Sequence, residues 1–426
     1  MSIKRVSLDE KSVTFEVVFS FGDSMLQSEN ELQDELNELG TLATGELLNK
    51  FDADGSPIVI GSSRMTSKGL VPKTYQTPYG AVEIERYVYQ SSEGGATFCP
   101  LERDARIVVT STPRFAKQIS HKFAENASTQ TQKDLSENHN RYVARSYLQN
   151  VADAVGTVAT VKEEDWEYEP KEINKPIKTV SVGLDGTCML LCEEGYRETM
   201  VGTIALYDKM GKRQHTTYLA APPEYGKETF LTKLEKLVER AKSNYPKAKF
   251  IGLADGAKDN WSFLDSRTDA QTIDFWHATE YLSLASEVLY PKNKEQKEEW
   301  YEQKRHDLKH KYHTAARVMT ELKEYIKKNK VTKINKEKAN KVLTYYKNNK
   351  HMMNYPERLH NNEPMGSGVT EAACKVIVKQ RMCKSGAKWK NKGAAVVLNL
   401  RCLARSDGYW DQFWGKVDQY GFPVAA

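Results

Sequence analysis

The spacing of hydrophobic residues in the first quarter of the chain predicts a long helix followed by a β-hairpin. Residues 26–50 place apolar side chains at helical spacing among acidic residues, so we expect an amphipathic helix that ends or bends near Gly40. In residues 74–90, apolar and charged residues alternate after a Pro-Tyr-Gly turn, which is typical of an antiparallel hairpin. Residues 1–110 therefore form an N-terminal helix and β-hairpin region.

Three short helical patterns follow within residues 111–161. We expect the helices to begin at Pro113, to cover residues 129–136 and to cover residues 142–155. This order predicts a helix-turn-helix-like DNA-binding domain. The side chains that would then face DNA are Arg141, Arg145 and Gln149. Any three-helix bundle has the same pattern, so packing without DNA contact stays an alternative.

The pattern changes after residues 162–176, which are charged, contain two prolines and indicate a linker. Residues 177–277 then read as strands and one helix. The strands are expected at 178–187, 199–207, 214–220, 247–254 and 271–277, and the helix at 226–244. Three strands followed by a helix and a strand predict an α/β domain whose sheet begins as a meander.

A lysine-rich helical pattern from Ala278 to about Lys350 interrupts this domain. Its apolar residues recur near helical spacing, so we expect a helical insertion of residues 278–360, with C-terminal helices of the core in residues 361–426. Residues 291–350 contain 18 Lys and Arg against 8 Asp and Glu. Such helices can lie along a DNA backbone or present a solvated face, and charge alone leaves both readings open.

Composition narrows the class of protein. The chain of 426 residues has no apolar stretch as long as a membrane span and no signal-peptide pattern at its start, so we expect a cytosolic protein. Its six cysteines form no CxxC pair, which argues against a zinc ribbon and predicts reduced core residues. Residues 1–176 carry 19 Lys and Arg against 27 Asp and Glu, and the remainder carries 43 against 30. A basic C-terminal part suits a polyanionic partner.

Three acidic residues stand where a sheet edge would expose them. Asp185 and Asp255 each end an apolar strand and precede a glycine, so their side chains are expected to enter a cleft. Glu371 opens a helical pattern for which Ser367 is the expected N-cap. Three carboxylates on rigid elements can hold two divalent cations about 3.5–4 Å apart, which catalyses displacement at phosphorus. We therefore expect two Mg²⁺ ions, replaceable by Mn²⁺, and no small-molecule cofactor. Taken singly, each acid also fits an ordinary turn or first helical turn.

The succession of motifs resembles the DDE transposases of bacterial insertion sequences, in particular the ISKra type. The motifs are GLDGT, LADGAKDNW, DFWHATEYL and PMGSGVTEAACKVIVKQRM, followed by GAAVVLNLRCLARSDGYWDQFW. The resemblance spans roughly residues 178–415. It implies a ribonuclease H-like catalytic core interrupted by an all-helical insertion and preceded by an N-terminal helical and hairpin DNA-binding region. It also implies that Asp185, Asp255 and Glu371 are the catalytic carboxylates and metal ligands.

The function that this resemblance implies is DNA transposition. Such an enzyme binds the terminal inverted repeats of its insertion sequence and performs metal-dependent DNA cleavage and strand transfer. Its partners would be the double-stranded DNA of the transposon ends and of the target, and at least a second copy of the chain on DNA, in the bacterial cytoplasm at the nucleoid. Two alternatives stay open: a catalytically inactive transposase-derived DNA-binding protein, and a metal-dependent nuclease without strand transfer.

Further residues beside these motifs are candidates for DNA contact. His277 ends the predicted last strand in a D-x-x-H pattern with Asp274; the resemblance places it near the cleft, and a helix-capping role is the alternative. Lys375 and Lys379 lie one and two helical turns beyond Glu371, where they reach phosphates that flank the cut or remain solvated.

A second set of candidates surrounds two tryptophans. Lys258 and Trp261 follow Asp255, and Trp261 either stacks on an unpaired base or packs in the core. Arg381 and Lys388 belong to a basic run before the last predicted helices, where they suit DNA. Some relatives carry paired cysteines after the hairpin, but only Cys99 is present here, so no zinc knuckle is expected.

Overall fold

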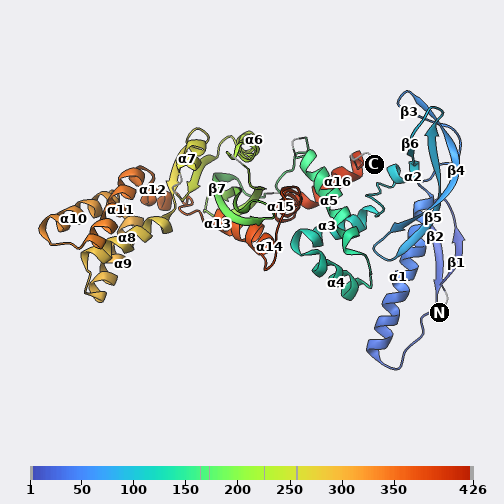
Figure 1. Cartoon of the computed structure of the whole chain (residues 1–426), viewed down its shortest axis with the longest axis horizontal. Helices are drawn as coiled ribbons and strands as arrows, with labels where there is room; N and C mark the ends of the chain where they lie inside the picture. The colour runs from blue at the N-terminus through green and yellow to red at the C-terminus, as the bar shows by residue number, and fades with distance from the viewer. Residues whose placement is uncertain (1–2, 164, 172, 225, 256–257, 423–426) are drawn as a thin grey trace. The chain divides into compact units, whose positions relative to one another are not determined.

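The computed structural model describes residues 3–163, 165–171, 173–224, 226–255 and 258–422 (Figure 1). The chain divides into two compact units. One comprises Met1–Tyr168, Ala395–Ala404 and Tyr409–Ala426, and the other Glu169–Ala394 and Arg405–Gly408. Within the described residues, no helix has both the length and the apolar character needed to cross a bilayer.

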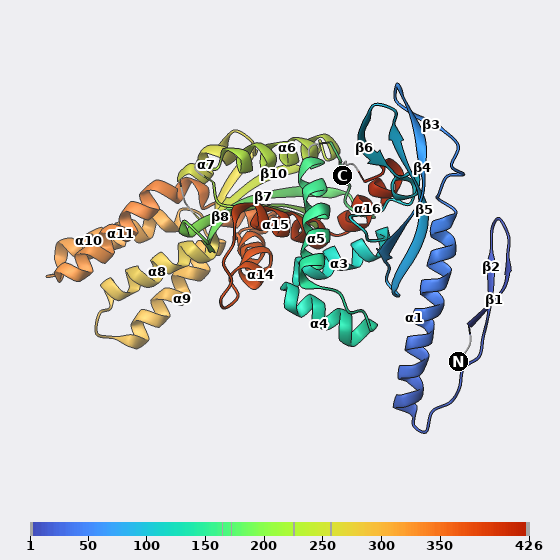
Figure 2. The same ribbon diagram turned by 45° about the vertical axis from the view of Figure 1, so that its right-hand side comes forward.

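The first unit begins with a hairpin and a long helix. Strands β1 (Ile3–Leu8) and β2 (Val13–Val17) pair antiparallel. Helix α1 (Met25–Asn49) runs through Gly40 without interruption (Figure 2). A Cβ atom added to Gly40 would lie 2.4 Å from the ring of Tyr79, so this glycine serves the close approach of the helix to that ring. The expectation that the helix ends or bends at Gly40 is wrong.

The hairpin expected in residues 74–90 is confirmed and belongs to a larger sheet. Strands β3 (Ile58–Ile60), β4 (Ser63–Gln76), β5 (Ala81–Ser91) and β6 (Gly94–Phe98) pair in that order, all antiparallel. The short helix α2 (Pro100–Asp104) follows. The Tyr75 hydroxyl donates to Glu102 at 2.8 Å and accepts from Arg86 Nε at 2.7 Å, which fastens α2 to this sheet.

Three helices then form as the pattern predicts. They are α3 (Pro113–Glu125), α4 (Ser128–His139) and α5 (Arg145–Val161). The chain returns to this unit with most of α15 (Asn391–Arg405) and with α16 (Tyr409–Tyr420). A Cβ atom added to Gly156 would lie 2.5 Å from Val396, so α15 packs closely on α5. Trp166, in the segment expected to be a linker, packs edge-on against Phe413 at 5.6 Å.

The second unit is built on a mixed five-stranded sheet of order β11-β10-β7-β8-β9. Its strands are β7 (Ile177–Leu191), β8 (Gly195–Asp208), β9 (Arg213–Ala221), β10 (Lys249–Ala254) and β11 (Ala270–Ile273). Strands β7, β8 and β9 are antiparallel neighbours, whereas β10 and β11 run parallel to β7. The α/β class expected from the sequence is confirmed, including the initial meander.

Helices cover both faces of this sheet (Figure 2). Phe230 and Leu234 of helix α6 (Glu228–Asn244) lie over Gly202 of β8 and share a buried hydrophobic cluster with the even-numbered β7 residues from Val180 to Leu184. Helix α14 (Gln380–Met382) lies on the opposite side (Figure 2). Alternate residues of a strand point to opposite faces, so the odd-numbered residues from Ser181 to Asp185 face away from α6.

Five α-helices and one short 3₁₀ helix, η1 (Lys350–Met352), separate β11 from the last part of the unit. The α-helices are α8 (Phe275–Leu289), α9 (Lys294–His310), α10 (Thr314–Lys328), α11 (Lys333–Asn349) and α12 (Tyr355–His360), here called the helical segment. Trp300, Leu308, Val318 and Leu322 are buried in its own hydrophobic cluster. Tyr312, which lies between α9 and α10, is by contrast 54% exposed.

The last strand is shorter than the sequence pattern suggests. Strand β11 ends at Ile273, and α8 begins at Phe275. The Asp274 side chain accepts a hydrogen bond from the backbone nitrogen of His277 at 2.8 Å, so it is the N-cap of α8. The prediction of a strand through residue 277 is therefore wrong, and His277 lies in the first turn of a helix.

Candidate active site

Asp255 directly follows the end of β10, and Asp185 lies within the neighbouring parallel strand β7, which continues to Leu191. The expectation that Asp185 ends a strand is therefore wrong. Gly183 of β7 pairs with Leu253 of β10, and adjacent strands are about 4.8 Å apart. The negative charge of Asp255 raises the pKa of Asp185, so the two carboxyl groups lie near one another, at the edge of the sheet where β10 ends.

The third acid reaches this edge on α13 (Gly368–Ala373), which packs on the face of β7 that carries Gly183. The hydroxyl oxygens of Thr370 on α13 and Thr203 on β8 lie 2.8 Å apart. A Cβ atom added to Gly183 would lie 2.0 Å from the Thr370 hydroxyl, so only glycine allows the helix this close to the strand. Glu371 is the next residue, and its position follows from this contact.

The helix changes its hydrogen-bonding pattern directly after Glu371. Residues Cys374–Lys379 form a π-helical segment, η2, and such segments are frequent at functional sites. The Cys374 thiol donates a hydrogen bond to Asp185 Oδ2 at 3.6 Å. Burial and the negative charge of Asp185 raise the pKa of Cys374, so the thiol stays protonated and can donate. This contact joins the helix of Glu371 to the strand of Asp185.

The three carboxyl groups influence one another electrostatically. Burial is the main cause that raises the pKa of Asp185, and the negative charges of Asp255 and Glu371 raise it further. Hydrogen bonds from the Gly186 backbone nitrogen, at 2.7 Å, and from Cys374 lower the pKa in part. A partly buried carboxylate that is repelled by two others is the setting that a divalent cation stabilises.

A hydrogen-bonded network holds the start of α13. Asp274 is fully buried, and its Oδ2 accepts from the Ser367 backbone nitrogen at 2.6 Å and from the Ser367 hydroxyl at 3.0 Å. The same hydroxyl lies 2.6 Å from Glu371 Oε1, and His277 Nε2 lies 3.9 Å from that oxygen. Ser367 occupies the expected N-cap position, but its side chain binds these two acids and not the helix backbone.

Two groups of residues compete as metal ligands. Within the part of the chain that is described, Asp274, His277 and Glu371 have ligand atoms within 4.8 Å of one another. Asp274 is a poor ligand, because its oxygens already accept hydrogen bonds from His277 and Ser367. Asp185, Asp255 and Glu371 do not form so close a group in the described residues, but their chemistry fits Mg²⁺ better, since it prefers carboxylate oxygens and the charges of Asp255 and Glu371 repel that of Asp185.

The residues expected to contact DNA divide by exposure. Arg145, Gln149, Lys375, Lys379 and Lys388 are exposed. Trp261 is partly buried and packs against the hydrophobic clusters of both the sheet and the helical segment. The side chain of Lys258, at the start of α7 (Lys258–Asp265), lies outside the described residues.

Two of the residues expected to contact DNA are instead buried. Arg141 is buried: its Nε donates to the Thr77 carbonyl at 3.1 Å, and its guanidinium lies 5.1 Å from the ring centre of Phe115. Arg381 is also buried, with its guanidinium 4.9 Å from the ring centre of Trp389. Both guanidinium groups contact aromatic rings inside the protein, so neither group is presented to a phosphate backbone.

The expectation that all cysteines are core residues is wrong in part. Cys99, Cys374 and Cys402 are buried, but Cys188, Cys192 and Cys383 are exposed, and all six are free thiols. The Cys383 thiol lies 3.5 Å from the Cys188 carbonyl oxygen, beyond the end of η2.

Sequence reasoning missed the residues that position the acids. Thr203 lies outside the quoted motifs, and Thr370 and Cys374 lie inside one without being singled out, although Gly183 within an otherwise apolar strand signals a close backbone approach. Asp274 and Ser367 were noted, but their direct hydrogen bonds join residues 93 positions apart and are visible only in the folded chain. Comparison of the sequence with protein-family models and with curated proteins finds no match in either.

Proposed function

We propose that the protein is a DDE-type DNA transposase that cuts and joins DNA with Asp185, Asp255 and Glu371. The observation that carries the proposal is the position of Asp185 on β7 beside the end of β10, which Asp255 follows, together with the packing of α13 on β7. The negative charges of Asp255 and Glu371 both act on Asp185, and neighbouring carboxylates of this kind suit metal-dependent displacement at phosphorus.

The fold supports a ribonuclease H-like core within this proposal. Three antiparallel strands followed by two strands parallel to the first, with helices on both faces, match the arrangement that the resemblance implies. The helical segment then corresponds to the insertion that precedes the glutamate. Fold alone does not decide function, so the acids carry the argument.

The chain's own residues would bind and orient the reacting groups. Asp185, Asp255 and Glu371 would hold two Mg²⁺ ions, which supply activation of the attacking hydroxyl and stabilisation of the leaving oxygen. The Cys374 thiol orients Asp185, and Asp274 holds Ser367 so that α13 begins at a fixed place. No covalent intermediate on the protein is needed, because water or a DNA 3′-hydroxyl is the nucleophile.

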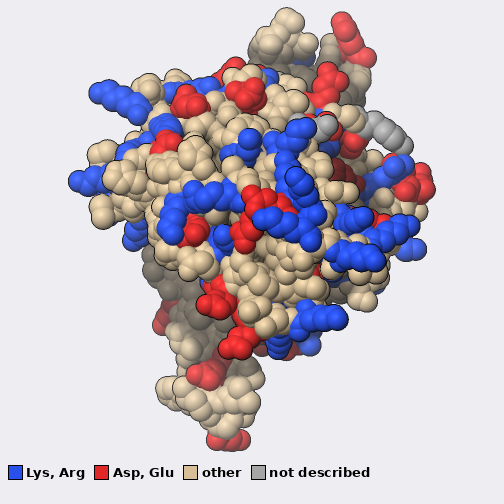
Figure 3. Space-filling view, turned by 90° about the vertical axis from the view of Figure 1, so that its left-hand side faces the viewer, with Lys and Arg blue, Asp and Glu red and all other residues tan. Residues whose placement is uncertain are grey.

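Exposed basic side chains supply surfaces for the DNA partner. Lys and Arg side chains are spread over the helical segment on the face shown in Figure 3, with acidic side chains between them. In the first unit, Arg145 and Gln149 are exposed on α5. We assign transposon-end recognition to α5 and backbone contact to the helical segment, with at least two copies of the chain on DNA at the bacterial nucleoid.

A cleavage and strand-transfer assay tests the proposal. The substrate is DNA with the ends of the insertion sequence that encodes the protein, with Mg²⁺ or Mn²⁺. Asp185→Asn, Asp255→Asn and Glu371→Gln are expected to bind this DNA and to leave it uncut. Glu324→Gln, at a side chain that is 61% exposed on α10, is the matched control and should cut normally.

Each other result has a definite meaning. Normal cutting by one of the three variants would remove that residue from the site. Hydrolysis without joining by the unaltered protein would identify a nuclease, and binding without cutting would identify an inactive DNA-binding derivative.

A further inference from the structure

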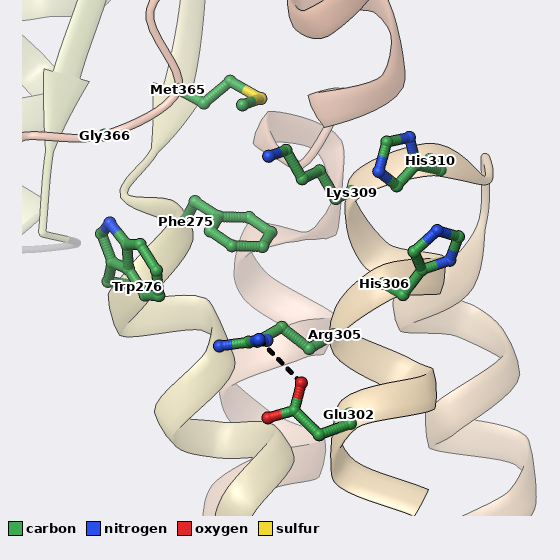
Figure 4. Close-up of a pocket in the computed structure, with 9 residues that line it drawn as sticks. All are labelled: Phe275, Trp276, Glu302, Arg305, His306, Lys309, His310, Met365 and Gly366. Carbon is green, nitrogen blue, oxygen red and sulfur yellow. Dashed lines mark ion pairs between the residues drawn. The ribbon is translucent and has the colours of Figure 1, made fainter.

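A cavity of about 480 Å³ lies between the helical segment and the loop before α13 (Figure 4). Its walls come from the start of α8, from the last turns of α9 and from that loop. The lining residues are Phe275, Trp276, Glu302, Arg305, His306, Lys309, His310, Met365 and Gly366. Ligand pockets in proteins span about 300–1,000 Å³, so the cavity has room for one nucleotide and not for a duplex.

One wall of the cavity is aromatic. Phe275 is buried and packs edge-on against Tyr355, with ring centres 5.1 Å apart, which anchors it in the core of the helical segment. Trp276 is 61% exposed, although it follows directly on Phe275. A large aromatic ring held at a cavity while most of its surface meets water is suited to stacking on a planar ligand.

The facing wall is cationic. Arg305, His306, Lys309 and His310 lie on one face of α9, because residues four apart in a helix stand above one another. Figure 4 shows Arg305 and Lys309 reaching from α9 toward α8. Arg305 pairs with Glu302 at 2.7 Å, so the wall combines a braced guanidinium with a lysine ammonium. Both groups are suited to a phosphate.

The cavity borders the candidate active site. Trp276 stands between Asp274 and His277 in the chain, and Gly366 precedes Ser367, which contacts Glu371. A Cβ atom added to Gly366 would lie 3.1 Å from Asp274 Oδ2 and 3.9 Å from the Trp276 ring. The loop before α13 therefore contacts both the N-cap of α8 and the aromatic wall of the cavity at Gly366. A nucleotide in the cavity would therefore be a near neighbour of a phosphate held at Glu371.

We propose that this cavity binds one unpaired nucleotide of the DNA strand that is cut, with its base against Trp276 and its phosphate near Arg305 and Lys309. The inference rests on the proposed transposase function and adds to it a substrate subsite. The aromatic wall fits the base, the cationic wall fits the phosphate, and the position beside Glu371 fits a nucleotide next to the cleaved bond. Such a site favours DNA that is opened at its end over a closed duplex.

The experiment measures binding apart from cutting. The full-length Glu371→Gln protein is titrated with two DNA substrates, one fully paired and one with a 2-aminopurine nucleotide left unpaired beside the mapped cleavage position. We expect tighter binding of the unpaired substrate and a change in its fluorescence. Adding Trp276→Ala should remove that preference, weakening binding of the unpaired substrate by roughly 5- to 100-fold while paired DNA binds as before.

Companion variants keep the test independent of folding. Trp276→Phe retains a stacking ring and should keep part of the preference, and Lys309→Ala should weaken it. Tyr312→Ala, at a ring that is 54% exposed just beyond α9, is the matched control and should change nothing. Equal melting temperatures establish that each variant is folded.

Two outcomes would overturn the inference while leaving the proposed function intact. One is an unchanged preference in folded Trp276→Ala. The other is binding of free deoxyadenosine monophosphate as tight as that of the unpaired DNA, which would assign the cavity to a soluble nucleotide. Failure of the unaltered protein to bind or cut any DNA end would instead remove the proposed function itself.

Discussion

The hydroxyl groups of Thr203 on β8 and Thr370 on α13 lie 2.8 Å apart, although 167 positions separate these residues in the chain. Thr370 also occupies the space above Gly183, where a Cβ atom would come within 2.0 Å of its oxygen. Because Glu371 follows Thr370, this pair of threonines fixes the height of the third acid above the sheet.

Gly183→Ala should therefore disturb both stability and cutting. The added methyl group meets Thr370, so we expect a loss of about 1–3 kcal/mol in the free energy of unfolding and a loss of DNA cleavage as α13 is displaced. Denaturant unfolding and the cleavage assay measure the two effects. Gly368→Ala is the control, because nothing lies within 4 Å of the added atom; it should cut normally. Normal cutting by Gly183→Ala would contradict the role of this contact.

Arg358→Ala should destabilise the second unit strongly. Arg358 pairs with Glu363, and both side chains are at most 4% exposed. Without Arg358, a buried carboxylate keeps only Lys249 as its cationic partner, at 3.0 Å, so we expect a loss of about 3–5 kcal/mol in the free energy of unfolding. Lys328→Ala removes the exposed pair with Glu324 and should change stability by less than about 0.5 kcal/mol. Urea titration compares the two.

Arg141 and Arg145 should have opposite phenotypes. Arg141→Ala removes buried hydrogen bonds to Thr77 and Gln76, so it should lower the free energy of unfolding by about 2–3 kcal/mol. Arg145→Ala should leave stability unchanged and weaken DNA binding. The slope of the logarithm of the binding constant against the logarithm of the salt concentration should decrease by about one, as expected for the loss of one phosphate contact. Thermal melting and binding at several salt concentrations measure these effects. Equal stability of both variants would contradict the burial of Arg141.

Thiol labelling should distinguish two classes of cysteine. A disulfide reagent at pH 8 should modify Cys188, Cys192 and Cys383 in the folded protein and all six cysteines only after unfolding. Burial raises the pKa of Cys383, so a smaller fraction of this residue is thiolate at pH 8 and its labelling should be slowed. Mass spectrometry of the labelled peptides identifies the sites. Fast labelling of Cys374 would show that it is not held against Asp185.

Stability should fall as the pH drops below about 6.5 because of His215. Burial lowers the pKa of His215 below its usual value of 6.5 in the folded state. The unfolded chain then binds a proton that the folded chain does not, so the stability is present above about pH 6.5 and is lost as the pH falls toward the folded pKa. Urea titrations of His215→Gln should show a smaller pH dependence, whereas His306→Gln, on an exposed ring, should match the unaltered protein.

Local patterns were sufficient for most elements of the second unit. The apolar runs of β7, β8, β9 and β10 are predicted because buried strands need them. The sequence of β11 misleads, since Phe275 and Trp276 suit a strand as well as a helix; the Asp274 cap decides in favour of the helix. Gly40 misleads in the opposite way, because its role depends on Tyr79, which belongs to another element.

For the candidate site, the sequence predicts which strand or helix positions each acid, but not the contacts between these elements. Asp255 follows β10 as the sequence predicts, whereas Asp185 lies within β7, which continues to Leu191. The proximity of the two acids, and the contacts of Thr370 with Thr203 and of Cys374 with Asp185, depend on how distant segments pair. The exposure of Arg141 could not be predicted for the same reason: the residue type does not reveal whether an arginine is buried or faces solvent, and Arg141 is buried.

The helical segment also has a consequence for the order of biosynthesis. A ribosome makes Asp185 and Asp255 first, then the whole helical segment, and only afterwards Glu371. The segment has its own hydrophobic cluster, so it can fold while the nascent chain is still growing. If the three acids are the cutting site, a chain whose translation stops within the segment lacks the last of them, and unfinished copies are unable to damage the genome of the cell that makes them.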